Sequence, residues 1–122
     1  MKKQSLLKRF RFASSGVLHA LQSESSFRLQ CLAALGVLIL LAVLQPEPIW
    51  WAIFLLTTSI VLAAELFNTA LELVLDTLHP EKNQKIGQAK DCAAGAVFTL
   101  SLISVGVLIA FLVHFFLTRI IQ

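Results

Sequence analysis

The sequence has few charged residues and few residues that break helices. Only 14% of its 122 residues are Asp, Glu, Lys or Arg, and it contains three prolines and five glycines. A soluble domain carries about 25% charged residues, whereas 57% of this chain is hydrophobic and its mean hydropathy is +0.82. This balance excludes an ordinary soluble domain. It predicts one all-α membrane domain that covers residues 1–122.

Several familiar signatures are also missing. The two cysteines, Cys31 and Cys92, stand alone in apolar segments, which favours buried apolar side chains over a disulfide or a metal site. No G-x-x-x-x-G-K-[ST] or G-x-G-x-x-G motif occurs, so a nucleotide would not be held by a P-loop or a Rossmann turn. We expect no nucleic-acid partner. We also expect no removable signal peptide, because the first long apolar run starts only near Leu29 and no small-residue cleavage site closes a shorter one.

Apolar runs and polar breaks predict one surface helix and three membrane-spanning helices. In the first segment apolar residues recur at helical spacing, while basic residues lie off that stripe, which is typical of an amphipathic helix in the membrane interface. The alternative is a soluble helix docked on the protein's own cytosolic end. Each later apolar run is long enough to cross roughly 30 Å of hydrocarbon. We place the surface helix at about 5–22 and the spans at about 28–45, 48–78 and 88–118, with a polar loop over 79–87.

The distribution of charge predicts the orientation in the membrane. Basic residues precede or open the first span, or lie between the second and third spans: Lys2, Lys3, Lys8, Arg9, Arg11, Arg28, Lys82, Lys85 and Lys90. The positive-inside rule therefore places the N-terminus and the second connection in the cytosol. Nearly all acidic residues lie on the same side, and only Glu47 falls outside.

Four polar residues form a stripe along the second predicted span. Glu65, Asn68, Glu72 and Asp76 are separated by steps of three and four, so a helix places them on one face. Ionisable residues near a membrane interior are costly and are usually functional. The alternative is a helix that leaves the bilayer and becomes amphipathic against a partner.

Carboxylates, an amide and a lysine at a membrane face suggest a divalent cation with a phosphate ligand. Mg²⁺ is commonly held by one or two carboxylates together with substrate phosphates, and Glu24 and Glu72 are the natural ligands here. Lys90 would offset phosphate charge. Glu65 lies deepest in the apolar layer, which suits a general base for a lipid hydroxyl.

Three motifs carry a resemblance to a known family. They are E-L-F-N-T-A-L-E-L-V-L-D at residues 65–76, A-K-D-C-A-A-G-A-V at 89–97 and E-S-S-F-R at 24–28. With them the chain resembles the small integral-membrane diacylglycerol kinases of bacteria, a family that also includes undecaprenol kinases. The resemblance covers almost the whole chain. It implies MgATP-dependent phosphorylation of a lipid alcohol in the bacterial inner membrane, by a homotrimer with cytosolic active sites at its subunit boundaries.

The resemblance also implies roles for individual residues. Glu65 matches the catalytic base and contacts the lipid substrate, and Glu24 and Glu72 match the carboxylates that hold the metal of MgATP. The remaining positions that match nucleotide-binding or substrate-binding residues are Asn68, Glu81, Lys90 and Asp91 for the nucleotide and Arg28 for the substrate.

Not every family position is kept. Lys82 and Asn83 replace a Tyr and a His of the family loop, so contacts of that loop with adenine are not carried over. Gln30 stands where relatives often have Glu or His.

Diacylglycerol is our first interpretation of the substrate, and undecaprenol, with the same mechanism, is the alternative. A more distant alternative is a small oligomeric ion or proton translocator, which would need a carboxylate near the bilayer midplane. A third is a non-catalytic membrane subunit whose stripe only packs against a partner, in which case Glu65→Gln would leave function intact.

Overall fold

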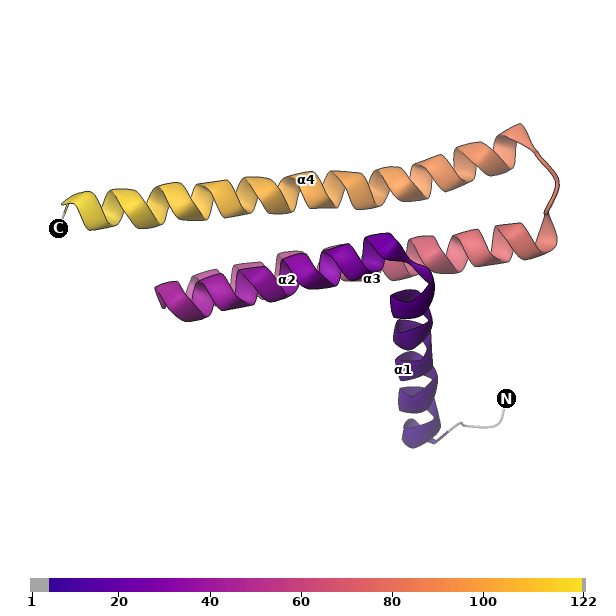
Figure 1. Cartoon of the computed structure of the whole chain (residues 1–122), viewed down its shortest axis with the longest axis horizontal. Coiled ribbons are helices and arrows are strands. Elements are labelled where there is room, and N and C mark those ends of the chain that lie inside the picture. Colours follow the sequence, from indigo (N-terminus) through magenta and orange to yellow (C-terminus); the bar gives the residue numbers. More distant parts are fainter. Residues whose placement is uncertain (1–4, 122) are drawn as a thin grey trace.

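The computed structural model describes residues 5–121, and this part of the chain is all-helical. Its elements in chain order are α1 (Leu6–Ser23), α2 (Ser25–Leu44), α3 (Pro48–Leu78) and α4 (Gln84–Ile121). Figure 1 shows α2, α3 and α4 running alongside one another, while α1 runs across their direction. Lys2 and Lys3, which contribute to the predicted orientation, lie outside the described residues.

The three long helices confirm the predicted class of protein. Over residues 5–121, α2, α3 and α4 are the helices that are long and apolar enough to cross a membrane. Most of their large hydrophobic side chains, such as Leu35, Ile60 and Val105, are exposed in the single chain. Exposed apolar surface on this scale needs lipid or further protein to cover it. The position of α1 in the membrane interface stays a prediction.

Two helix boundaries differ from those expected. The second helix begins at Ser25 rather than near 28, because only Glu24 adopts an extended conformation (φ −110°, ψ 115°) between α1 and α2. The last helix begins at Gln84 rather than 88, so the expectation of a polar loop up to residue 87 was wrong. The reason is Asn83, whose Oδ1 accepts a hydrogen bond from the N–H of Lys85 at 2.9 Å and so caps the first turn of α4.

The tight turn between α2 and α3 follows from its own residues. Gln45 adopts a left-handed conformation (φ 46°) and donates its backbone N–H to the carbonyl of Leu41 at 2.8 Å, which ends α2. Pro48 then opens α3 in its first turn, where its missing N–H costs no helical hydrogen bond.

The buried core of the bundle lies near this turn, at the end opposite the polar stripe of α3. Leu41, Phe54 and Phe111 form the core cluster, and Leu41 and Phe111 are fully buried. The rings of Phe54 and Phe111 meet edge to face with centroids 5.4 Å apart, and Trp50 lies 5.0 Å from Phe111. Aromatic packing therefore fixes α3 against α4 at this end, and the polar residues lie toward the other end.

Candidate active site

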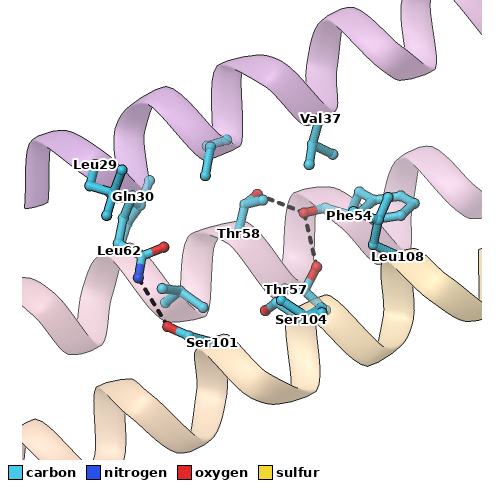
Figure 2. A pocket seen from close by; sticks show the side chains of 14 residues that line it. Leu29, Gln30, Val37, Phe54, Thr57, Thr58, Leu62, Ser101, Ser104 and Leu108 are labelled. Carbon is cyan, nitrogen blue, oxygen red and sulfur yellow. Dashed lines mark hydrogen bonds between the residues drawn. The ribbon is translucent and has the colours of Figure 1, made fainter. Parts of the chain in front are cut away.

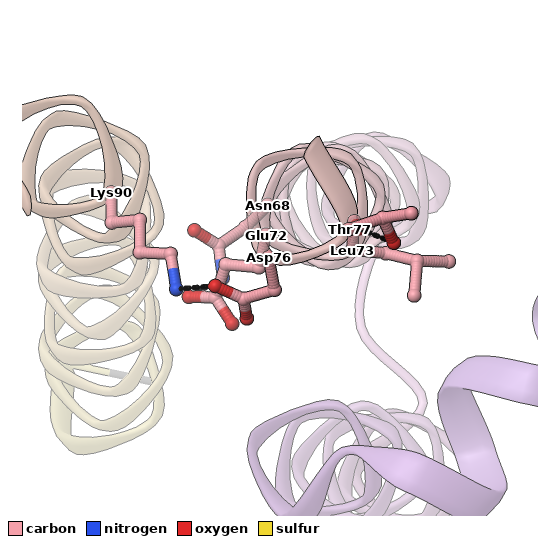
Figure 3. A network of polar contacts seen from close by, with 6 residues as sticks. All are labelled: Asn68, Glu72, Leu73, Asp76, Thr77 and Lys90. Carbon is pink, nitrogen blue, oxygen red and sulfur yellow. Dashed lines mark hydrogen bonds and ion pairs between the residues drawn. The ribbon is translucent and has the colours of Figure 1, made fainter. Parts of the chain in front are cut away.

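The predicted polar stripe lies on α3, on the side that faces α4 (Figure 3). Asn68 Nδ2 donates a hydrogen bond of 3.3 Å to Glu72 Oε1, one turn further along the helix. One more turn on, Asp76 forms an ion pair with Lys90 of α4. Three of the four residues that the spacing predicted thus take part in polar contacts, one within α3 and one between α3 and α4.

Glu65 is the residue of this stripe that the fold buries. Its side chain is 4% exposed, and it is the one acidic residue among residues 5–121 that is classed with the interior. It lines a cavity of about 340 Å³ together with Asn68 from α3, residues of α2 and residues of α4, which we call the Glu65 cavity. Glu24 and Glu72 both lie within electrostatic range of Glu65. The structure therefore places two of the carboxylates that the sequence singled out within electrostatic range of the third.

The backbone around Glu65 is held by a neighbour one turn away. Thr69 is also buried, at 7% exposed, and its hydroxyl donates to the Glu65 carbonyl at 2.9 Å. A threonine hydroxyl bonded in this way needs no other partner, so it can be buried at little cost beside the carboxylate.

Glu24 owes its position to the corner between α1 and α2. It stands between the two helices, as the C-cap of α1 and the N-cap of α2, and its backbone N–H donates to the carbonyl of Ala20 at 2.9 Å. Its side chain makes no capping hydrogen bond at the start of α2, and it is half-buried. The corner therefore presents a carboxylate that the local helix ends do not use.

Arg28 has a structural role that the sequence did not indicate. Its Nη1 donates to the carbonyl of Leu21 at 3.0 Å and to that of Gln22 at 3.1 Å. These carbonyls belong to the last turn of α1, where a helix leaves acceptors without intrahelical partners. Arg28 thereby ties the end of α1 to α2, and its contact with a substrate stays a prediction.

Asn68 carries an acceptor that the chain does not use. Its Oδ1 is buried and has no hydrogen-bond partner within the part of the chain that the structure describes. Buried polar atoms nearly always have a partner, and the cost of leaving one unpaired is about 1–3 kcal/mol. An acceptor of this kind beside Glu65 and Glu72 fits a site that takes a donor, such as a hydroxyl or a metal-bound water.

Glu81 and Lys90 lie in a second, more open depression. It holds about 460 Å³ and is formed by the loop between α3 and α4 together with Asp76 and Lys90. Asp91 follows Lys90 on α4, is exposed, and lines neither this depression nor the Glu65 cavity. The predicted nucleotide residues are therefore not gathered in one place: Asn68 lines the Glu65 cavity, Glu81 and Lys90 line this depression, and the remaining three, Glu24, Glu72 and Asp91, line neither.

The donor set suits a magnesium ion that is shared with phosphate. Among residues 5–121 no group of three or more His, Cys, Asp and Glu side chains is close enough to enclose a metal alone. Glu24 and Glu72 lie within electrostatic range of Glu65, and Glu72 accepts the hydrogen bond of Asn68, whose own side-chain oxygen is unpaired among the described residues. Mg²⁺ takes one or two carboxylates and completes its shell with water and substrate phosphates, so these oxygens fit it.

The sequence analysis assigned no role in the site to two polar residues that line the Glu65 cavity. Gln30 of α2 and Ser101 of α4 both line it, and Gln30 Nε2 donates to Ser101 Oγ at 3.0 Å. The available signal was a polar residue inside each apolar run. No spacing rule relates positions so far apart in the chain.

The fold and the site define a small helical membrane protein whose carboxylates gather at one end of its bundle. Residues 11–112 match the family described as prokaryotic diacylglycerol kinase, which confirms the resemblance seen in the motifs. The chain belongs to the prokaryotic diacylglycerol kinase family, a family of lipid kinases.

Similar proteins carry two names. The chain is 36% identical over 102 residues to a diacylglycerol kinase of Synechocystis, a match that covers 83% of this chain and 58% of that longer protein. It is 34% identical over 104 residues to an undecaprenol kinase of Bacillus subtilis, covering 84% and 85% of the two chains. A diacylglycerol kinase of Haemophilus influenzae is 29% identical over 102 residues, covering 84% and 86%.

Proposed function

We propose that this protein transfers the γ-phosphate of MgATP to the hydroxyl of a membrane lipid alcohol, converting diacylglycerol to phosphatidic acid. The observation that supports this most directly is Glu65, a buried carboxylate with Glu24 and Glu72 in electrostatic range at the polar end of a spanning bundle. Membership in the family supplies the reaction class.

Glu65 is the general base of the proposed reaction. It takes the proton of the lipid hydroxyl as the hydroxyl oxygen bonds to the γ-phosphorus, while the bond from that phosphorus to the bridging oxygen breaks and ADP leaves. A base for a lipid must meet a hydroxyl near the boundary of the apolar layer. Glu65 lies on a spanning helix and lines a cavity, which suits that task.

Glu24 and Glu72 hold the metal of MgATP in this proposal. When bound, Mg²⁺ neutralises charge on the transferred phosphate. Asn68, which already donates to Glu72, keeps its carboxylate oriented and offers its own oxygen to the site. Lys90, Glu81 and Asp91 approach the rest of the nucleotide from α4 and the loop, and Arg28 approaches the lipid.

We further propose a homotrimer in the inner membrane of a bacterium, with its N-terminus and active site in the cytosol. Basic residues gather at the same end of the chain's spans as the acidic cluster, as the positive-inside rule requires for that end. The exposed apolar faces of the single chain leave room for neighbouring copies as well as lipid.

Undecaprenol is the alternative substrate, because a relative of that name matches at nearly the same identity as one named diacylglycerol kinase. The test is transfer of labelled γ-phosphate from MgATP to each lipid in parallel, with purified protein in lipid or detergent. Phosphorylated product from one lipid identifies the substrate. Folded protein that phosphorylates neither lipid in the presence of Mg²⁺ would contradict the proposal.

A further inference from the structure

Of the three carboxylates in the proposed site, only Glu24 lies outside α3. Glu65 and Glu72 share that helix, so its regular geometry fixes the spacing between them. Glu24 stands at the corner between α1 and α2, where α1 runs across the direction of the other helices (Figure 1). Its place within electrostatic range of Glu65 therefore depends on how this corner is held.

The α2 side of the corner is anchored in the bundle. Phe27, in the first turn of α2, is 3% exposed. Gln30 Nε2 then donates to Ser101 Oγ at 3.0 Å, and Figure 2 shows this bond joining α2 to α4. Because the start of α2 is fixed in this way, what remains to be set at the corner is the direction of α1.

Arg28 crosses the corner and bonds to α1. Long side chains on a helix point toward its N-terminus, so Arg28, four residues after Glu24, reaches back over the corner. Its Nη1 donates to the carbonyls of Leu21 and Gln22. The last turn of α1 has no basic residue of its own, although the negative end of a helix dipole favours a cation. Arg28 supplies that cation from the next helix.

The same corner leaves the carboxylate of Glu24 available. Its backbone N–H donates to the last turn of α1, and its carbonyl accepts the N–H of Arg28 at 3.2 Å, which opens α2. Its side chain makes no capping hydrogen bond. The backbone of Glu24 is thus held from both sides, and its side-chain oxygens are left for a ligand.

We propose that Arg28 is a positioning residue for Glu24. By bonding the end of α1 to the anchored α2, it holds the corner so that the Glu24 carboxylate stays within range of Glu65 and can take the metal of MgATP. The inference rests on the proposed function for the role of Glu24 as a metal ligand. The printed bonds of Arg28 use Nη1 alone, so a contact of its other nitrogens with the lipid is compatible with this role.

The test measures metal binding without lipid, so a contact of Arg28 with the substrate does not enter it. Electron paramagnetic resonance of Mn²⁺ in place of Mg²⁺ gives the affinity of the full-length protein for this ion in the presence of a nonhydrolysable ATP analogue. Arg28→Met should weaken the affinity by about tenfold or more, the usual effect of removing a group that orients a metal ligand. Arg28→Lys keeps a cation at the corner and should recover part of the loss. Arg11→Met, at an exposed basic residue of α1, is the matched control and should bind as the wild type does.

A double variant distinguishes action through Glu24 from an independent effect. Glu24→Gln alone should weaken Mn²⁺ binding. Adding Arg28→Met to it should cause no further loss, because a residue that acts only through Glu24 then has no ligand left to position. A structural role that is independent of Glu24 would add its own loss in the double variant and overturn the inference.

A distance measurement depends on neither metal nor turnover. Spin labels at Phe12→Cys on α1 and Phe67→Cys on α3, both exposed positions, report the direction of α1 in full-length protein that also carries Cys31→Ala and Cys92→Ala. With labelled chains diluted in unlabelled protein, the distribution of distances should broaden in Arg28→Met and stay as it is in the control variant. If the wild type binds no Mn²⁺ with nucleotide and phosphorylates no lipid, the proposed function fails, and this distribution still decides whether Arg28 holds the corner. A distribution that is unchanged in Arg28→Met would overturn the inference.

Discussion

At the scale of single residues, Glu65 and Glu72 have different surroundings, so replacing each of them should impair the kinase activity in a different way. Glu65 is buried on α3, whereas Glu72 is half-buried and accepts the hydrogen bond of Asn68. A base acts on the proton of the hydroxyl, and a metal ligand acts on the affinity for MgATP. The two carboxylates can therefore be separated by kinetics.

Glu65→Gln should lower kcat by about 10²–10⁴-fold, because glutamine has similar size but cannot take the hydroxyl proton. The affinity for MgATP should stay within about twofold, since proton transfer contributes little to binding of the ground state. Both are measured by γ-phosphate transfer and by titration with a fluorescent ATP analogue. Glu47→Gln, at an exposed acid beside the α2–α3 turn, is the matched control and should behave as wild type. Normal turnover of Glu65→Gln would favour a packing role for the stripe.

Glu72→Gln should instead raise KM for MgATP, by about tenfold or more, because one of the two proposed metal ligands loses its charge. Higher Mg²⁺ concentration should recover part of the activity, and it should have no such effect on Glu65→Gln. The measurement is the initial rate over a matrix of ATP and Mg²⁺ concentrations. If Glu72→Gln lowered kcat but left the KM for MgATP unchanged, Glu72 would not be a metal ligand.

The stripe was predictable, whereas its surroundings were not. Spacing of three and four fixes the shared face of Glu65, Asn68 and Glu72 on any helix. The contact of Gln30 with Ser101 depends on how α2 and α4 pack on α3, and no local pattern encodes that. The hydrogen bonds of Arg28 to the end of α1 were not predicted for the same reason, because their acceptors lie on the preceding helix.

At the scale of helices, the ends are set by a few capping groups. The three prolines and the left-handed Gln45 locate the breaks before α3 and before α4, and the break between α1 and α2 falls at Glu24 in the polar stretch that the sequence shows there. The start of α4 was placed too late, because Asn83 stands in a polar stretch where several residues can cap a helix. Capping depends on backbone angles that composition does not fix.

Asn83→Ala should lower the stability of the protein by about 1 kcal/mol, the usual cost of losing a side-chain N-cap. The physical reason is the loss of the acceptor for the N–H groups of Lys85 and Ile86. Thermal unfolding in detergent measures the change in Tm. Asn83→Asp keeps an acceptor at the same place and should restore most of the lost stability, and Lys82→Ala is the neighbouring control. An unchanged Tm in Asn83→Ala would show that the cap contributes nothing.

At the scale of the whole molecule, the single chain leaves apolar surface uncovered but contains all three proposed catalytic carboxylates. Its spans leave most large apolar side chains uncovered, which fits association with lipid and further copies. Yet Glu24 and Glu72 lie within electrostatic range of Glu65 in the same chain. The proposed trimer is therefore expected to take its base and its metal ligands from the same subunit, even where other groups come from a neighbour.

Mixed oligomers of Glu65→Gln and Glu72→Gln test this directly. Each subunit of such a mixture lacks either the base or one metal ligand. If every site takes both from one subunit, the activity of the mixture should stay at the level of the separate variants. If base and metal ligand came from different subunits, mixing would create some complete sites and restore part of the activity. Co-expression with two affinity tags and tandem purification isolates the mixed species, and light scattering with chemical crosslinking reports the number of subunits. Restored turnover would overturn the single-chain assignment, whereas its absence in oligomers shown to contain both variants would support it.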